Sequence, residues 1–91
     1  MSAKYVLSMD WSTYDNRKLA DGRDRSKFSC TELWEINFLV ESIQKSDSRY
    51  SVKEIRHAIN KCCSKPGVSR LRNEFVEEVL KTLGKNEIEK I

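Results

Sequence analysis

Two stretches of the sequence decide the fold: Phe28-Ser29-Cys30-Thr31-Glu32-Leu33 and Tyr50-Ser51-Val52-Lys53-Glu54-Ile55. In each, the serine side chain can accept a hydrogen bond from the amide of the following glutamate, whose carboxylate can reach back to the serine amide. This reciprocal arrangement is a capping box, and the apolar residues at the two ends of each stretch stand where a hydrophobic staple packs. We therefore expect Ser29 and Ser51 to be the N-caps of two helices.

The first of these helices is expected over residues 30–45 and the second from the Ser51 cap to about residue 63. A third helix is expected over residues 69–83, because Pro66-Gly67 breaks the second helix and Gly84 stands where a left-handed C-cap is common. Each helix has one apolar face on a helical wheel, as core helices do. The expected core consists of Leu33, Ile36, Val40, Ile55, Ile59, Leu71, Phe75 and Val79.

Residues 1–28 are expected to be extended or irregular. The apolar residues between positions 5 and 11 alternate as they would on one face of a strand, but no second strand-like run offers a partner. We expect this segment to lie across the helices and to be followed by a charged arm over residues 15–27 with Gly22 as a hinge. The tail, residues 85–91, carries two isoleucines, Ile88 and Ile91, at helical spacing, and is either a frayed extension or a docking tail.

The fold class is therefore predicted as all-α: a small three-helix domain over residues 29–84 with an extended or irregular N-terminal arm. At 91 residues, with 38% hydrophobic and 34% charged residues and a net charge of +3, the chain suits one polar globular domain. Its longest apolar run, Phe38-Leu39-Val40, is far below the roughly 20 residues that span a bilayer. The run Tyr5-Val6-Leu7 is too short for a signal peptide. We expect a cytoplasmic protein with no membrane contact.

The three cysteines are expected to be reduced, because Cys62 and Cys63 are adjacent and fit neither a disulfide framework nor a C-x-x-C metal knuckle. The one histidine, His57, is off the spacing of three or four residues that a helical metal pair with Cys62 would use. No nucleophile and base can be paired, and no phosphate-binding loop motif occurs. The sequence predicts no enzyme activity, no catalytic residues, no cofactor, no metal site and no small-molecule site.

Trp34 and Phe38 form an aromatic pair on the first helix, outside its core face. Two interpretations are open. Either the segment around residues 5–11 folds over this pair, or the pair is a patch that binds a protein partner or a second copy of the chain. The leading functional prediction is accordingly a non-catalytic protein-interaction module.

The alternative prediction is weak, sequence-tolerant binding of nucleic acid, since basic side chains on the outer face of a helix can neutralise phosphates. The expected contacts come from the second helix and from the arm: Lys53, Arg56 and Lys61, with Arg23, Arg25 and Lys27. A helix-turn-helix motif is not expected, because the turn before the third helix is too long. Arg72 falls inside the apolar arc of that third helix, where it either snorkels or pairs with a carboxylate of the arm such as Asp21 or Asp24.

Three segments follow one another along the chain: Asp24-Arg25-Ser26-Lys27, then Glu32 with Trp34-Glu35-Ile36, then Ser51-Val52-Lys53-Glu54-Ile55-Arg56-His57-Ala58-Ile59. Together they resemble a family of short bacterial helical domains whose function is unassigned, over about half of the chain. The resemblance implies two or three short helices behind a basic Asp-Arg-Ser stretch, and it implies no activity.

Overall fold

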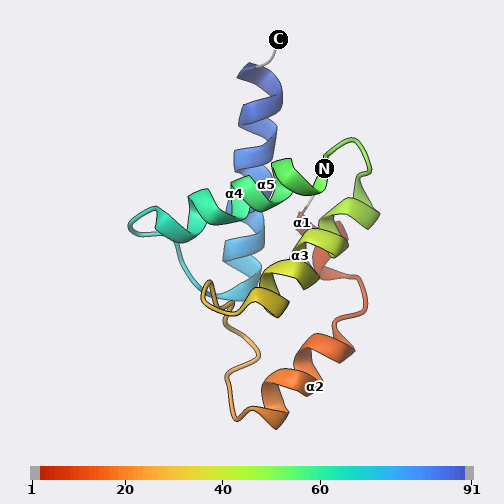
Figure 1. The fold of residues 1–91 in the computed structure, drawn as a ribbon, viewed down its shortest axis with the longest axis vertical. Helices are drawn as coiled ribbons and strands as arrows, with labels where there is room; N and C mark the ends of the chain where they lie inside the picture. Colours follow the sequence, from red (N-terminus) through yellow and green to blue (C-terminus); the bar gives the residue numbers. More distant parts are fainter. Residues whose placement is uncertain (1–2, 90–91) are drawn as a thin grey trace.

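The structure, a computed structural model, describes the backbone of residues 3–89 and the side chains of residues 5–84. Within these residues the chain forms helices α1 (Ala3–Leu7), α2 (Ser12–Ala20), α3 (Leu33–Ser46), α4 (Val52–Ser64) and α5 (Arg72–Glu89), shown in Figure 1. The prediction of an all-α fold is confirmed, whereas the prediction of three helices is wrong because the N-terminal part adds two. None of the described helices is long and apolar enough to cross a membrane.

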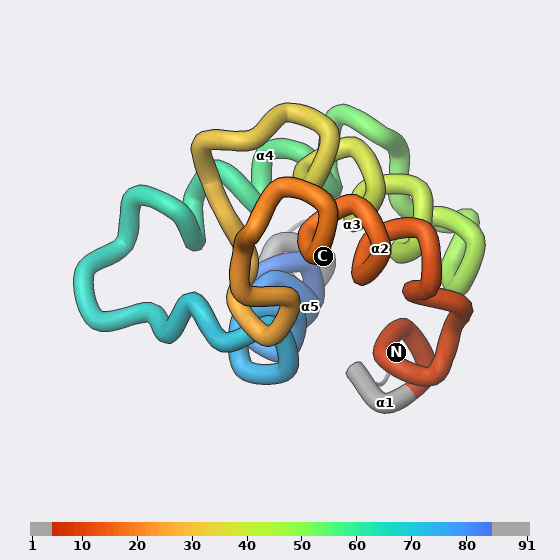
Figure 2. Tube along the Cα trace, turned by 90° about the horizontal axis from the view of Figure 1, so that it is seen from below, coloured from red at the N-terminus to blue at the C-terminus, as the bar shows by residue number. Residues whose placement is uncertain are grey.

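The long helix α5 is the centre of the packing. Helices α3 and α4 pack against each other, α4 crosses α5, and α1 packs against both α5 and α3. Figure 2 shows α5 in the middle, with α3 and α4 on one side and α1 on another. The side chains between these helices are buried: Val6, Ile36, Leu39, Val40, Ile43, Ile55, Ala58, Ile59, Cys62, Phe75, Val76, Val79, Leu80 and Leu83.

The predicted capping box at Ser51 is confirmed. The Ser51 hydroxyl oxygen accepts a 3.1 Å hydrogen bond from the amide of Glu54, and the Ser51 amide donates to the Glu54 carboxylate at 3.3 Å. These bonds satisfy amides at the helix start that have no partner within the helix. Helix α4 therefore begins where the sequence predicted.

The predicted capping box at Ser29 is wrong, because α3 begins at Leu33 and Glu32 is its N-cap, without a side-chain cap bond. The Ser29 amide donates to the carboxylate of Glu35 at 3.0 Å, and the carboxylate of Glu32 pairs with Arg23 instead. Glu35 and Arg23, two charged residues outside the stretch 29–32, thus bind the amide and the carboxylate that the capping box would have joined.

Two predicted core residues and one predicted cap are also wrong. Leu33 and Leu71 are 63% and 44% exposed, since each lies at the start of its helix, beyond the packed faces; the other six predicted core residues are buried. Gly84 does not end a helix, because α5 continues through it to Glu89. The side chains of the predicted tail, residues 85–91, lie outside the described residues.

The prediction of an extended N-terminal segment is wrong as well. Helix α1 turns Val6 into the core and leaves Tyr5 69% exposed, although Leu7 and Trp11 of the alternating set do pack against the core. The Trp11 indole donates to the carbonyl of Val6 at 3.1 Å, which joins α1 to the start of α2. Helix α2 ends at Ala20 with Asp21 as its C-cap, and the next residue, Gly22, has a φ of +71°, which suits the left-handed residue that follows a helix C-cap.

Candidate binding surfaces

Helix α2 covers the aromatic pair on α3. The Tyr14 ring centroid lies 5.3 Å from that of Trp34 and 5.4 Å from that of Phe38, and the Trp11 ring lies 5.0 Å from Phe38. The guanidinium of Arg17 sits 4.5 Å above the Trp34 ring. Trp34 and Phe38 are therefore half-buried in an aromatic cluster, and the structure brings no open patch together at these two residues.

A buried ion pair joins α2 to α3 beneath this cluster. The Lys18 ammonium donates to Glu35 Oε1 at 2.8 Å and to the carbonyl of Lys27 at 2.6 Å. The same carboxylate oxygen accepts hydrogen bonds from the Tyr14 hydroxyl at 2.6 Å and from the Ser29 amide at 3.0 Å. Lys18 is 2% exposed and Glu35 is fully buried. If one of the two charges were removed, water could not take its place beside the other.

The second oxygen of the Glu35 carboxylate has no hydrogen-bond partner in the part of the chain that the structure describes. The guanidinium of Arg23, which pairs with Glu32 at the surface, lies 3.9 Å from this oxygen. Burial raises the pKa of the Tyr14 hydroxyl far above its usual range, and the hydrogen bond to Glu35 raises it further. Tyr14 therefore stays a neutral donor to the carboxylate at any physiological pH.

A second ion pair holds α2 to α5. The Arg72 guanidinium lies 2.8 Å from the carboxylate of Asp15 and 4.7 Å above the Trp11 ring. The prediction that Arg72 pairs with an acidic residue of the N-terminal part is right in kind, but Asp21 and Asp24 are not the partner. Both of them are exposed beyond the end of α2.

The outer face of α4 collects exposed basic side chains: Lys53, Arg56 and Lys61, with His57 and Asn60 between them. Arg56 donates to the side-chain oxygen of Asn37 on α3 at 2.8 Å, which fixes one edge of the face. Among the described residues, none of the three cations forms an ion pair. We call these three cations the α4 basic face.

The predicted basic residues of the arm lie elsewhere. Arg23 is engaged by Glu32, while Arg25 and Lys27 are exposed on the segment that follows α2. Figure 1 shows this orange segment level with α2 at the bottom, whereas α4 crosses the middle of the molecule. The structure therefore does not gather the six predicted nucleic-acid contacts on one surface.

A hollow of about 350 Å³ lies where the loop after α4 meets α5. Its walls carry Glu74, Glu77 and Glu78, and Lys65 lies 3.4 Å from the Glu78 carboxylate. With Lys65 and Lys81 among its lining residues, the hollow has a net charge of −1, so it offers phosphate no attraction comparable to that of the α4 basic face.

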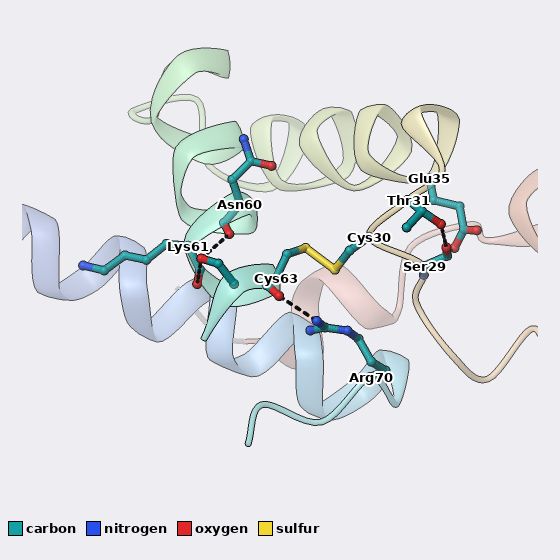
Figure 3. The surroundings of a disulfide bond; sticks show 9 residues. Ser29, Cys30, Thr31, Glu35, Asn60, Lys61, Cys63 and Arg70 are labelled. Atoms are coloured by element: carbon teal, nitrogen blue, oxygen red, sulfur yellow. Dashed lines mark hydrogen bonds between the residues drawn. A yellow bond between two sulfur atoms is a disulfide. The ribbon is translucent and has the colours of Figure 1, made fainter. Parts of the chain in front are cut away.

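Cys30 and Cys63 form a disulfide, with their Cα atoms 5.9 Å apart (Figure 3). The prediction of three reduced thiols is therefore wrong for these two residues. Adjacent residues point about 100° apart on a helix, so Cys62 faces the core as a free thiol while Cys63 faces the loop before α3. The sequence pattern alone gave no reason to pair residues that only the packing of α3 against α4 brings together.

Disulfides are typical of oxidising compartments. The predicted cytoplasmic location is therefore not supported by this bond and stays a prediction. His57 is exposed on α4 while Cys62 is buried 3.5 Å from the Thr82 hydroxyl. Among the side chains that the structure describes, no group of three or more His, Cys, Asp or Glu could hold a metal ion.

No protein family, curated protein or solved structure matches this chain. The family resemblance in the sequence accordingly stays a prediction.

Proposed function

We propose that this chain is a non-catalytic binding module whose α4 basic face contacts the phosphate backbone of nucleic acid. The carrying observation is that Lys53, Arg56 and Lys61 are exposed on one face and form no ion pair among the described residues. Such cations attract a polyanion, and their binding releases counterions that were condensed around it. This release supplies most of the affinity in non-specific binding.

The spacing along α4 suits a nucleic-acid strand. A rise of about 1.5 Å per residue puts Lys53 and Lys61 roughly 12 Å apart along the helix axis. That length corresponds to about three to four phosphates of one strand at a rise of roughly 3.4 Å each. Three cations on this length can therefore contact about three phosphates.

Binding through this face is expected to be indifferent to base sequence. The His57 imidazole is the one ring that the described α4 face offers for base stacking, and phosphate contacts carry no sequence information. The loop over residues 65–71 separates α4 from α5 by more than the turn of three or four residues in a helix-turn-helix. The first turns of α5 carry Glu74, Glu77 and Glu78, which oppose insertion into a groove.

The test is fluorescence anisotropy with a labelled DNA duplex, titrated at several salt concentrations from about 50 mM upward. About three phosphate contacts predict a slope of log affinity against log salt of roughly −2.7. Because the arm lies apart from α4, this slope is shallower than the value of roughly −5.4 that six gathered cations would give.

Two triple variants separate the α4 basic face from net charge. Replacing Lys53, Arg56 and Lys61 with glutamine should abolish the slope, since each contact releases its own share of counterions. Replacing the exposed Arg25, Lys27 and Lys81 with glutamine removes the same charge from other surfaces and should leave most of the affinity. Equal losses in the two variants, or no binding by the native chain at low salt, would contradict the proposal.

Binding of a protein partner at Trp34 and Phe38 would require a change in the fold. Both side chains lie under α2 in the folded chain, with Tyr14 against each of them. A protein contact at this surface therefore requires α2 to leave it.

A further inference from the structure

The N-terminal segment, residues 3–21, is held to the rest of the protein by side chains. Among the described residues, no hydrogen bond from backbone to backbone links residues 3–23 to residues 26–89. The contacts include the aromatic cluster, the Lys18–Glu35 and Arg72–Asp15 ion pairs, and the packing of α1 on α3 and α5. Side chains of the segment also donate to the carbonyl of Lys27, and the sulfur of Met9 accepts from Ser46. An interface made by side chains, without hydrogen bonds between the two backbones, resembles the interface between two domains or subunits.

The protein body begins abruptly after this segment. The Phe28 amide donates to the carbonyl of Arg70 at 2.7 Å, and the Arg72 amide donates to the carbonyl of Ser26 at 2.7 Å. The ring of Phe28 stacks on that of Phe75 at 4.6 Å, and the next anchor is the Cys30 disulfide. The chain is thus fixed to α4 and α5 from residue 26 onward.

Residues 22–25 connect the N-terminal segment to the body, and we call these four residues the hinge. Gly22 begins this hinge with a φ of +71°, and a Cβ placed there would meet nothing within 4 Å. Two side chains of the hinge contact the body. The Arg23 guanidinium forms a partly exposed pair with Glu32, which is worth little at a surface, and lies 3.9 Å from the second oxygen of Glu35, while the Asp24 carboxylate accepts from Ser26. The hinge can therefore change direction without breaking apolar core contacts, at the cost of these polar ones.

The surface under α2 is specific for what covers it. Glu35 is a fully buried carboxylate beside two aromatic rings, and it needs a cation to replace lost hydration. Helix α2 supplies Lys18 for the carboxylate and Tyr14 for the rings, and its N-cap residue Trp11 adds a contact with Phe38. A ligand with this charge and these rings at these spacings exists in every other copy of the chain.

We propose that the N-terminal segment can leave its own body and dock at the same place on a second copy, so that two chains form a dimer by exchanging residues 3–21. The exchanged contacts are the native ones, and only the hinge changes conformation, which makes exchange a low-cost route to a dimer. The short hinge gives the segment a millimolar effective concentration at its own body. The native chain is therefore monomeric at micromolar concentration and exchanges near millimolar concentration.

Charge reversal tests the exchange directly. Lys18→Glu and Glu35→Lys each place like charges together within one chain, so neither chain can dock its own segment or that of an identical copy. In an equimolar mixture, however, one crossed site regains the native pair and the other holds the pair with both signs reversed. Sedimentation velocity at about 50 µM should show monomers for each variant alone and on the order of tenfold more dimer in the mixture.

The matched control is one chain that carries both Lys18→Glu and Glu35→Lys. Its reversed pair can form within the chain, so it should remain a monomer whose Trp34 is protected from a quencher. A mixture of the two single variants that stays monomeric, while each retains its helical circular dichroism, would overturn the proposal.

A measurement on the native chain covers the case in which a single variant fails to fold. Unlabelled and ¹⁵N-labelled chains are mixed at about 1 mM, heated, cooled and examined by native mass spectrometry. A dimer of mixed mass is expected, and a sample with monomers alone overturns the exchange. A mixed-mass dimer that persists when α2 is removed from both chains also overturns it, because another surface then joins the copies.

Discussion

Replacing Glu35 with glutamine should cost about 3 to 5 kcal/mol of unfolding free energy, because it leaves the ammonium of Lys18 buried without a counter-charge. Lys18 is 2% exposed and its remaining acceptors would be the carbonyl of Lys27 and a neutral amide. A domain of this length is stable by about 5 to 14 kcal/mol. The substitution therefore removes a large share of the total, although glutamine has nearly the shape of glutamate.

The assay is urea unfolding followed by circular dichroism and tryptophan fluorescence on the same samples. Lys18→Met is the companion variant, and it should cost less, because Tyr14 and the Ser29 amide still donate to the carboxylate. Combining Lys18→Met with Glu35→Gln removes both charges, while the amide oxygen can still accept from Tyr14 and the Ser29 amide, so the double variant should cost less than Glu35→Gln alone. The sum of the two single losses of unfolding free energy should therefore exceed the loss in the double variant.

The measured loss has an upper limit. If the N-terminal segment detaches before the body unfolds, global stability can fall by no more than the docking free energy of that segment. Trp11 fluorescence would then change at lower urea than the helical signal. If Glu35→Gln lowers the free energy of unfolding by less than about 1 kcal/mol while Trp11 stays buried, the reasoning is refuted. A buried ammonium without a counter-charge should destabilise the fold by more than that.

Three further predictions concern single contacts. Ser51→Ala should lower the free energy of unfolding by about 0.5 to 2 kcal/mol through loss of the cap, as measured by urea unfolding. Cys30→Ser opens the disulfide to Cys63 and should cost about 3 to 4 kcal/mol, from the loop entropy of a 33-residue separation; a reducing agent should have the same effect on the native chain and none on the variant. The pKa of Asp47 is held at about 2 by its hydrogen bond to Arg49. The stabilisation from this lowered pKa is complete above the ordinary pKa of aspartate and is lost as pH falls toward 2; NMR titration of Arg49→Gln should show the Asp47 pKa rising.

The parts of the fold that the sequence predicted are those set by local interactions. Helix α4 begins at Ser51 because the cap, the reaching carboxylate and the apolar periodicity all lie within one turn and its continuation. No other part of the chain competes for these groups. The apolar stripes of α3 and α5 likewise follow from spacing alone, since a helix buries its apolar face against any apolar neighbour.

Ser29 shows how the same local pattern fails. Its stretch matches that of Ser51, but the two groups that would join the Ser29 amide to the Glu32 carboxylate each have a charged partner from elsewhere in the chain. Arg23 takes the Glu32 carboxylate, Glu35 takes the Ser29 amide, and the neighbouring Cys30 is bonded to Cys63. Charge-assisted bonds are about twice as strong as neutral ones, so these contacts prevail over a cap.

The surfaces were predicted unevenly for a related reason. The exposure of the α4 basic face follows from the helical wheel, because the opposite side of α4 is apolar. Whether Trp34 and Phe38 are open depends instead on α2, whose polar sequence has no side-chain cap and few apolar residues. Such a helix is stable only through the groups it docks against, so the local sequence predicted an irregular arm.

Two charges on core-facing arcs nevertheless pointed to a missing element. Arg72 of α5 and Glu35 of α3 both lie against apolar neighbours, and a buried charge requires a partner of opposite sign. Helix α2 supplies both partners from positions one turn apart, with Asp15 on Arg72 and Lys18 on Glu35. If α2 lay in the opposite direction, Asp15 would meet Glu35 and Lys18 would meet Arg72, and both contacts would be repulsive. The two ion pairs therefore fix the direction of α2, and they would impose the same direction on an α2 donated by a second copy.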